Sequence, residues 1–190
     1  MIAQRAGTGW VLGLAFASLG CGDDLGFGTW LAVPDTSVIY SLSRPELLRQ
    51  PAAYDFVQLR RVVVENPGTT GTWDVVLAEE SGEFVIVPAS NFPLLSDSRA
   101  VVGVTTNTTL ESLREAPGDT TAYSRAPVRL REGAVYVVRS RREVCVGFGS
   151  GVRYGKFQVL AMDAAMGAVT IAAVRNPFCN DRKLIPPDEN

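Results

Sequence analysis

The sequence predicts a mostly β protein, either an antiparallel β-sandwich or a partly closed barrel, with one or two short helices. Segments rich in Val and aromatic residues recur along the chain, turns containing Gly, Pro and Asn separate them, and helix-start patterns are few. Short strands without long helices are typical of sandwiches and barrels. The predicted strands are residues 56–64, 72–79, 82–88, 99–106, 126–131, 134–141, 153–163 and 168–176.

Alternation within these segments indicates antiparallel pairing. In YGKFQVL, Phe157 and Val159 point to one face of an extended strand, whereas Lys156 and Gln158 point to the other. Antiparallel sheets commonly have one buried and one solvated face, while parallel sheets are built from continuous apolar runs. We therefore expect an antiparallel sheet with one face in water.

The two helix-start patterns have the spacing of a capping box. Ser43 precedes Glu46 by three residues, and Thr108 precedes Glu111 by the same interval. In this arrangement each side chain satisfies a backbone N–H group at the start of a helix. The predicted short helices are residues 43–50 and 108–116.

The composition is that of one globular domain, and it excludes several classes of function. The chain has 190 residues and a formal net charge of -2, with basic residues scattered among acidic ones, which argues against non-specific nucleic-acid binding. It has no His, and therefore no His-based nucleophile pair or general base and no His-ligated zinc or haem. Its three Cys cannot form a four-sulfur metal site. We predict a protein that is not an enzyme and has no cofactor or metal.

The N-terminal segment has the features of a bacterial signal peptide. Arg5 supplies positive charge, and WVLGLAFA, residues 10–17, is an apolar stretch of the length that export signals use. SLGC, which ends at Cys21, resembles the lipobox, a Leu-small-small-Cys pattern whose Cys is acylated, with Leu19 one position later than usual. AFA, which ends at Ala17, is the alternative site, for ordinary signal peptidase.

We favour lipidation at Cys21, because this residue ends the apolar stretch and a polar Gly-Asp-Asp follows at once. The acyl chains would hold the mature protein to a membrane. Gly22, rather than Asp, after the Cys indicates the outer membrane under the enterobacterial sorting rule, and the inner membrane is the alternative. The predicted organisation is a signal peptide (1–20), a Gly-rich tether (21–35), one β domain (36–182) and a loose polar tail (183–190).

Export into an oxidising compartment predicts a disulfide between Cys145 and Cys179. With Cys21 assigned to lipid, the remaining two Cys form an even pair. Two unrelated buried thiols are the alternative.

Two pairs of residues are candidates for ligand binding. Arg139 and Arg141 would share one face of an extended strand, where their guanidinium groups could meet an anion. A charged, solvated face is the alternative for this pair. Met162 and Met166 flank the turn DAAMG, and a thioether can contact an apolar ligand or ligate haem iron. Filling of the core is the alternative for the Met pair.

Two fragments resemble the HmuY-like family of bacterial haem-carrier lipoproteins. The first is TWDVVL, residues 72–77, in which Trp73–Asp74 are the matching positions. The second is the later run VYVVRSR, RYGKFQVLAMD and GAVTIAAVRNP, in which Tyr154–Lys156 are the matching positions. The resemblance covers under a third of the chain, and it implies a mostly antiparallel β fold and carriage of haem. Haem in that family is often held by His, which this chain lacks, and Met162 or Met166 is the candidate ligand in its place.

The predicted function is that of an outer-membrane lipoprotein whose β domain binds a small ligand or an envelope protein, or has a structural role. A haemophore-like carrier of haem or another apolar molecule is the first alternative. A hydrolase that works with carboxylates alone is the second. A deep apolar cavity would favour the carrier, and two convergent buried carboxylates would favour the hydrolase. A filled core with a flat exposed patch would favour the protein that binds a partner.

Overall fold

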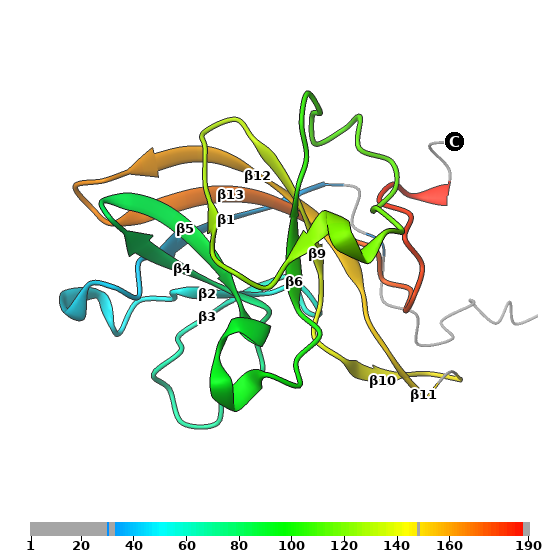
Figure 1. The fold of residues 1–190 in the computed structure, drawn as a ribbon, viewed down its shortest axis with the longest axis horizontal. Helices are drawn as coiled ribbons and strands as arrows, with labels where there is room; N and C mark the ends of the chain where they lie inside the picture. Colours follow the sequence, from blue (N-terminus) through cyan, green and yellow to red (C-terminus); the bar gives the residue numbers. More distant parts are fainter. Residues whose placement is uncertain (1–29, 31–32, 148, 188–190) are drawn as a thin grey trace, which may run out of the picture.

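Two antiparallel sheets stack face to face in the part of the chain that the computed structural model describes, residues 30, 33–147 and 149–187 (Figure 1). The larger sheet has the strand order β1-β13-β12-β9-β6-β7. Its strands are β1 (Asp35–Tyr40), β6 (Val101–Val104), β7 (Tyr123–Ser124), β9 (Val135–Arg139), β12 (Tyr154–Asp163) and β13 (Ala168–Arg175).

The smaller sheet has five strands, in the order β3-β2-β4-β5-β8. They are β2 (Ala53–Asp55), β3 (Arg60–Val62), β4 (Val75–Glu80), β5 (Glu83–Pro88) and β8 (Val128–Arg129). A separate hairpin, β10 (Glu143–Cys145) with β11 (Gly149–Gly151), projects from the sandwich at the end opposite the β12–β13 turn (Figure 1). Neither sheet closes on itself among the described residues, so the fold is the predicted sandwich and not a barrel.

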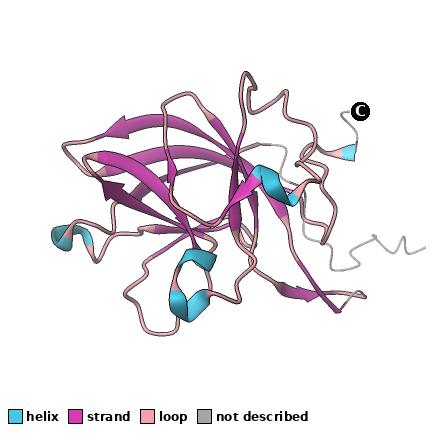
Figure 2. Ribbon diagram, viewed as in Figure 1, coloured by secondary structure: helices cyan, strands magenta, loops and turns pink. Residues whose placement is uncertain are grey.

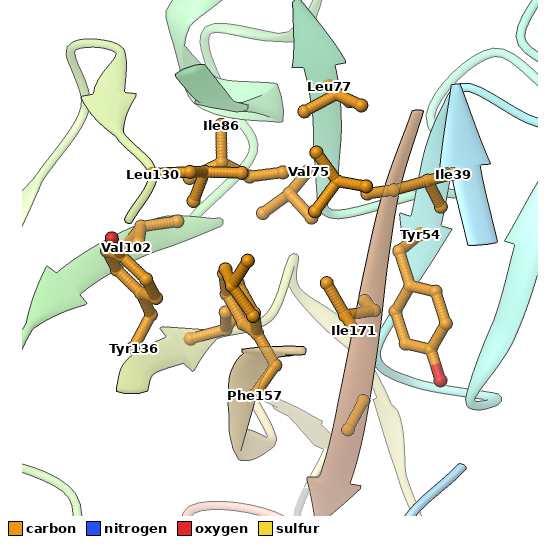
Figure 3. Packing of buried hydrophobic residues seen from close by; sticks show 14 of the residues in the cluster. Ile39, Tyr54, Val75, Leu77, Ile86, Val102, Leu130, Tyr136, Phe157 and Ile171 are labelled. Atoms are coloured by element: carbon orange, nitrogen blue, oxygen red, sulfur yellow. The ribbon is translucent and has the colours of Figure 1, made fainter. Parts of the chain in front are cut away.

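The main hydrophobic core lies between the two sheets (Figure 3). Phe157 and Val159 are buried in it, as their alternation along the strand predicts. The ring of Phe157 stacks on that of Tyr136 at a centroid distance of 5.0 Å. Each fully buried Val, Leu, Ile or Phe contributes about 1.5–3 kcal/mol relative to an exposed one. The core also contains Ile39, Tyr54, Val75, Leu77, Ile86, Val102, Leu130 and Ile171.

The outer faces of both sheets are partly covered by loops, which corrects the expectation of one solvated face. Trp73 on the outer side of the smaller sheet packs edge-on against Phe92, with ring centroids 5.4 Å apart. On the larger sheet, Val135 and Val137 are covered by the loop that contains Leu110 and by Leu184 near the C-terminus. Because both of its faces are covered, β9 has four consecutive buried residues.

Of the two predicted short helices, the first is present only as a 3-10 turn and the second does not form. Only a 3-10 turn, η1 (Pro45–Leu47), forms in the first segment, because Ser43 hydrogen-bonds the backbone of Glu79 and does not cap it. In the second segment, Thr109 and Ser112 bond each other and only turns form. Figure 2 shows the remaining short helical turns in loops. They are η2 (Ala89–Asn91), η3 (Pro93–Leu95) and η4 (Thr120–Ala122).

The predicted domain limits also need correction. The tether was expected to reach residue 35, but Asp35 already pairs with Ala173 in β1, and Trp30 packs near Phe178. The tail from residue 183 was expected to lie loosely, but Leu184 and Ile185 are buried. Both ends of the domain therefore extend beyond 36–182. The signal peptide, Cys21 and most of the tether lie outside the described residues, in which no helix is long and apolar enough to cross a membrane.

Candidate functional site

A polar pocket lies at the end of the sandwich from which the β10–β11 hairpin projects. Its volume is about 240 Å³. Three arginines line it, together with backbone and polar side chains from the hairpin and the C-terminal segment. We call it the arginine pocket, and its residues are Arg99, Arg139, Arg142, Ser150, Gly151, Val152, Tyr154 and Asn180.

Strand pairing places the central arginine. Arg139 is the last residue of β9 and lies directly opposite Tyr154 of β12 and Val101 of β6. Residues directly opposite on neighbouring strands point to the same face, so Arg139 and Tyr154 reach the pocket together. The Arg139 guanidinium lies 5.9 Å from the ring centre of Tyr123, and its Nε donates to the carbonyl of Arg99 at 3.3 Å. A ring face and a carbonyl thus orient this side chain.

The disulfide holds one wall of the pocket. Cys145 in β10 is bonded to Cys179, as predicted, and their Cα atoms are 6.1 Å apart. Asn180 follows at once: its N–H donates to the Val152 carbonyl at 2.8 Å, and its Oδ1 accepts from the Val152 N–H at 3.2 Å. A Cβ on Gly151 would lie 2.6 Å from the Cys145 sulfur, so only glycine fits beneath the bridge.

The positive charge of the pocket is not balanced by any acidic residue in the described part of its lining. No Asp or Glu lines it, and none of its three arginines forms an ion pair with another described residue. Glu143, which directly follows Arg142 in the chain, is paired with Arg153. Several arginines that line one pocket without a carboxylate beside them favour binding of phosphate, sulfate or a carboxylate.

Arg141 does not join Arg139, and this corrects the predicted pair. Strand β9 ends at Arg139, and the Arg141 side chain turns into the interior instead. Its Nη1 donates to Asp55 Oδ1 at 2.8 Å and to Asp74 Oδ2 at 3.2 Å. Arg142, which was not part of the predicted pair, lines the pocket together with Arg99.

Asp55 and Asp74 are two convergent buried carboxylates, the feature expected of a hydrolase. Both residues have no exposed surface. Asp74 accepts the N–H groups of Phe56 and Arg141, each at 2.6 Å, and Asp55 accepts those of Val57 and Gln58. Every carboxylate oxygen of the pair accepts at least one hydrogen bond from the protein, since Arg60 Nε reaches Asp55 Oδ2 at 3.3 Å. The pair therefore ties chain segments together and has no access to a substrate.

Burial raises the pKa of Asp74 to about 6, although the charge of Arg141 and its backbone N–H pull the pKa in the other direction. The sequence signal for this cluster is an acidic residue inside an apolar segment, in AYDF and in TWDVVL. A buried acid of this kind is either paired or costly.

A second pocket, of about 250 Å³, lies next to the arginine pocket. Its walls are mainly apolar, and Leu94 at its edge is 93% exposed. We call it the Trp73 pocket, and its residues are Gly71, Trp73, Ala89, Leu94, Leu95, Asp97, Ser98, Arg141 and Arg142.

The two predicted Met ligands are not brought to one pocket. Met162 packs against the main core and lines a surface pocket of about 310 Å³ with Phe84 and Leu130. Met166 is 56% exposed and does not line that pocket. Core filling therefore accounts for much of the Met162 side chain, and Met166 is a turn residue.

The positions matched to the HmuY-like family have structural partners. Asp74 belongs to the buried cluster, and Trp73 lines the pocket named after it. Lys156 is 3% exposed, and its Nζ donates to the Leu113 carbonyl at 2.8 Å. Tyr154 lines the arginine pocket.

Glu143, Cys145 and Cys179 also lie close together, with ligand atoms within 4.8 Å of one another. Both sulfurs are used by the disulfide and Glu143 is paired with Arg153, so this group offers no thiolate to a metal.

Comparisons of the chain with models of protein families, with curated proteins and with solved structures find no match.

Proposed function

We propose that this chain is an exported, membrane-anchored binding protein whose β-sandwich binds a small anion in the arginine pocket. The observation that carries the proposal is that Arg99, Arg139 and Arg142 line one pocket, with no Asp or Glu among its described lining residues. Like charges that line one pocket repel one another, and a bound anion would relieve that repulsion. The role is binding and not catalysis.

The state of the acidic residues supports a non-enzymatic role. Asp55 and Asp74 are the convergent acids, and their oxygens are occupied by backbone N–H groups and by arginines. General acid or base work needs a carboxyl group that reaches the substrate. A pair with no exposed surface does not meet this requirement.

Anchoring through Cys21 supports a place at a membrane surface. The apolar stretch ahead of this residue and the polar residues after it fit a lipidated export signal. The disulfide fits the oxidising compartment to which such a signal leads. The anchored protein would then present the arginine pocket to molecules in the envelope.

Carriage of haem, which the HmuY-like resemblance implies, is the second candidate. Its support is the pocket that Met162 shares with Phe84 and Leu130. Titration of the full chain with haem should shift the Soret band, and the shift should vanish in the Met162→Ala, Met166→Ala double variant. An unshifted band in the wild type contradicts this candidate.

Calorimetric titration of the full chain with inorganic phosphate, at constant ionic strength set with chloride, tests the main proposal. We expect saturable binding in the millimolar range or tighter. Each of Arg139→Gln and Arg142→Gln should weaken it at least about tenfold, because hydrogen bonds to charged groups contribute about 1.5–3 kcal/mol.

Arg61→Gln is the matched control, since Arg61 is an exposed arginine on β3, in the other sheet. This variant should bind phosphate as the wild type does. Absence of saturable binding by the wild type, or an equal loss in Arg61→Gln, contradicts the proposal.

A further inference from the structure

We infer that the ligand is an amphipathic organic anion, whose anionic group lies in the arginine pocket and whose aromatic ring or short aliphatic chain lies in the Trp73 pocket. This inference rests on the proposed function, because it assigns the chemical class of the ligand bound there. The Trp73 pocket is then a second subsite, which no sequence pattern indicated.

The two pockets are neighbours. Arg142 lines both of them. Ser98 and Arg99 are consecutive residues that line different pockets. Ser98 lines the Trp73 pocket, and Arg99 lines the arginine pocket. A ligand whose anionic group meets Arg142 on one side can therefore place an apolar group on the other side of the same side chain.

The Trp73 pocket has the lining that an apolar group requires. Trp73, Ala89, Leu94 and Leu95 form its apolar surface, and Leu94 is 93% exposed. Covering such an exposed aliphatic side chain removes a large apolar area from water, and this area contributes favourable free energy to ligand binding.

Charge defines the direction in which the ligand binds. Asp97 lines the Trp73 pocket, whereas none of the described residues that line the arginine pocket is acidic. A second anionic group in the Trp73 pocket would be repelled by Asp97, while Arg141 there is already paired with Asp55 and Asp74, and Arg142 is shared with the arginine pocket. The ligand class is therefore one with a single anionic end and an uncharged apolar end.

The subsite is pre-formed. Arg141 is part of its lining, and Asp55 and Asp74 hold Arg141 in place at 2.8 and 3.2 Å. Trp73 is adjacent to the anchored Asp74 and packs against Phe92. A pocket that is already ordered loses little conformational entropy when a ligand binds.

Size restricts the ligand further. Each pocket alone is smaller than the roughly 300 Å³ at which usual ligand sites begin, whereas the two together fall within the usual range. A Trp73 pocket of about 250 Å³ accommodates one ring or a short chain, and this selects a small soluble molecule over a long-chain lipid.

Two phosphate monoesters of equal charge test the inference on the full chain. Calorimetry should show that 2-phenylethyl phosphate binds about tenfold more tightly than methyl phosphate, because its ring is partly removed from water. Leu94→Ser should remove most of that advantage and leave the affinity for methyl phosphate unchanged. The Leu94→Ser substitution should leave the fold intact, because the Leu94 side chain is almost fully exposed.

Met166→Ser is the matched control, because Met166 is exposed in the turn between β12 and β13. That turn lies at the end of the sandwich opposite the β10–β11 hairpin (Figure 1). The Met166→Ser variant should preserve the advantage of the phenylethyl ester. Equal affinities for the two esters in the wild type overturn the inference while leaving the proposed function intact, whereas failure to bind either ester overturns both. Vesicles of anionic phospholipid that displace the phenylethyl ester at equal phosphate concentration contradict the assignment to a small molecule.

Discussion

Asp74 and Arg141 are 67 positions apart in the chain and are joined twice: the Asp74 carboxylate accepts the Arg141 backbone N–H at 2.6 Å and its Nη1 at 3.2 Å. The first contact fixes the backbone just after β9, and the second fixes the side chain. Arg142, the next residue, lines both pockets. A fully buried carboxylate thus connects the smaller sheet to the segment that carries the proposed binding site.

Replacement of Asp74 by Ala should destabilise the protein by about 2–4 kcal/mol. The buried N–H groups of Phe56 and Arg141 would lose their acceptor, and an unsatisfied buried polar group costs about 1–3 kcal/mol. Urea denaturation measures the free energy of unfolding. Asp97→Ala, at an exposed position, should change it by less than about 0.5 kcal/mol. Equal effects of the two substitutions would show that the buried contacts contribute little.

The titration of Asp74 should make stability depend on pH. Its pKa rises from 3.8 to about 6 on folding, so between these values the folded state binds more protons than the unfolded state. Stability from this group is therefore present below about pH 4 and is lost as the pH rises to about 6. The free energy of unfolding of the wild type, minus that of Asp74→Asn, should fall by up to about 3 kcal/mol over this window. A difference that is constant or rises with pH contradicts the raised pKa.

Loss of the Cys145–Cys179 disulfide should destabilise the fold by about 3–4 kcal/mol, because the bridge closes a loop with a sequence separation of 34. Urea denaturation of the Cys145→Ala, Cys179→Ala double variant measures this. The variant should also bind phosphate more weakly, since Asn180 and Gly151 form part of the arginine pocket. A reductant should destabilise the wild type and leave the double variant unchanged. Full stability after reduction would be inconsistent with this role.

Cys21 should carry the lipid. Cells grown with a labelled fatty acid should give a labelled wild type and an unlabelled Cys21→Ala variant, while the Cys145→Ala, Cys179→Ala variant should keep its label. An unlabelled wild type that begins at Ser18 would instead indicate cleavage after Ala17.

Much of the fold could be predicted because strand patterns are local. Each predicted strand segment overlaps an observed strand, and the long hairpin of β12 and β13 matches closely. The short strands β2, β7, β10 and β11 have two or three residues each and leave no periodic pattern. The predicted helix at residues 43–50 is reduced to a 3-10 turn, because the Ser43 hydroxyl donates to the backbone carbonyl of Glu79, 36 positions away. Such a tertiary contact overrides a capping pattern.

The binding site could be predicted only in part. Arg139 was identified from the strand pattern, and the disulfide from Cys spacing and export. Arg99 joins the pocket because β6 pairs with β9, a contact between segments about 40 residues apart. Arg141 was misplaced because the end of β9 could not be located to one residue. A shift of one position in a strand moves a side chain to the other face.

An anomalous diffraction experiment tests the central claim most directly. Crystals of the full chain would be soaked in sodium selenate, which mimics sulfate, and lattice contacts must leave the arginine pocket open. We predict a selenium peak between the guanidinium groups of Arg139 and Arg142, with selenate oxygens within hydrogen-bonding distance of their nitrogens. An empty arginine pocket, at a selenate concentration that saturates other anion sites on the molecule, would contradict the account.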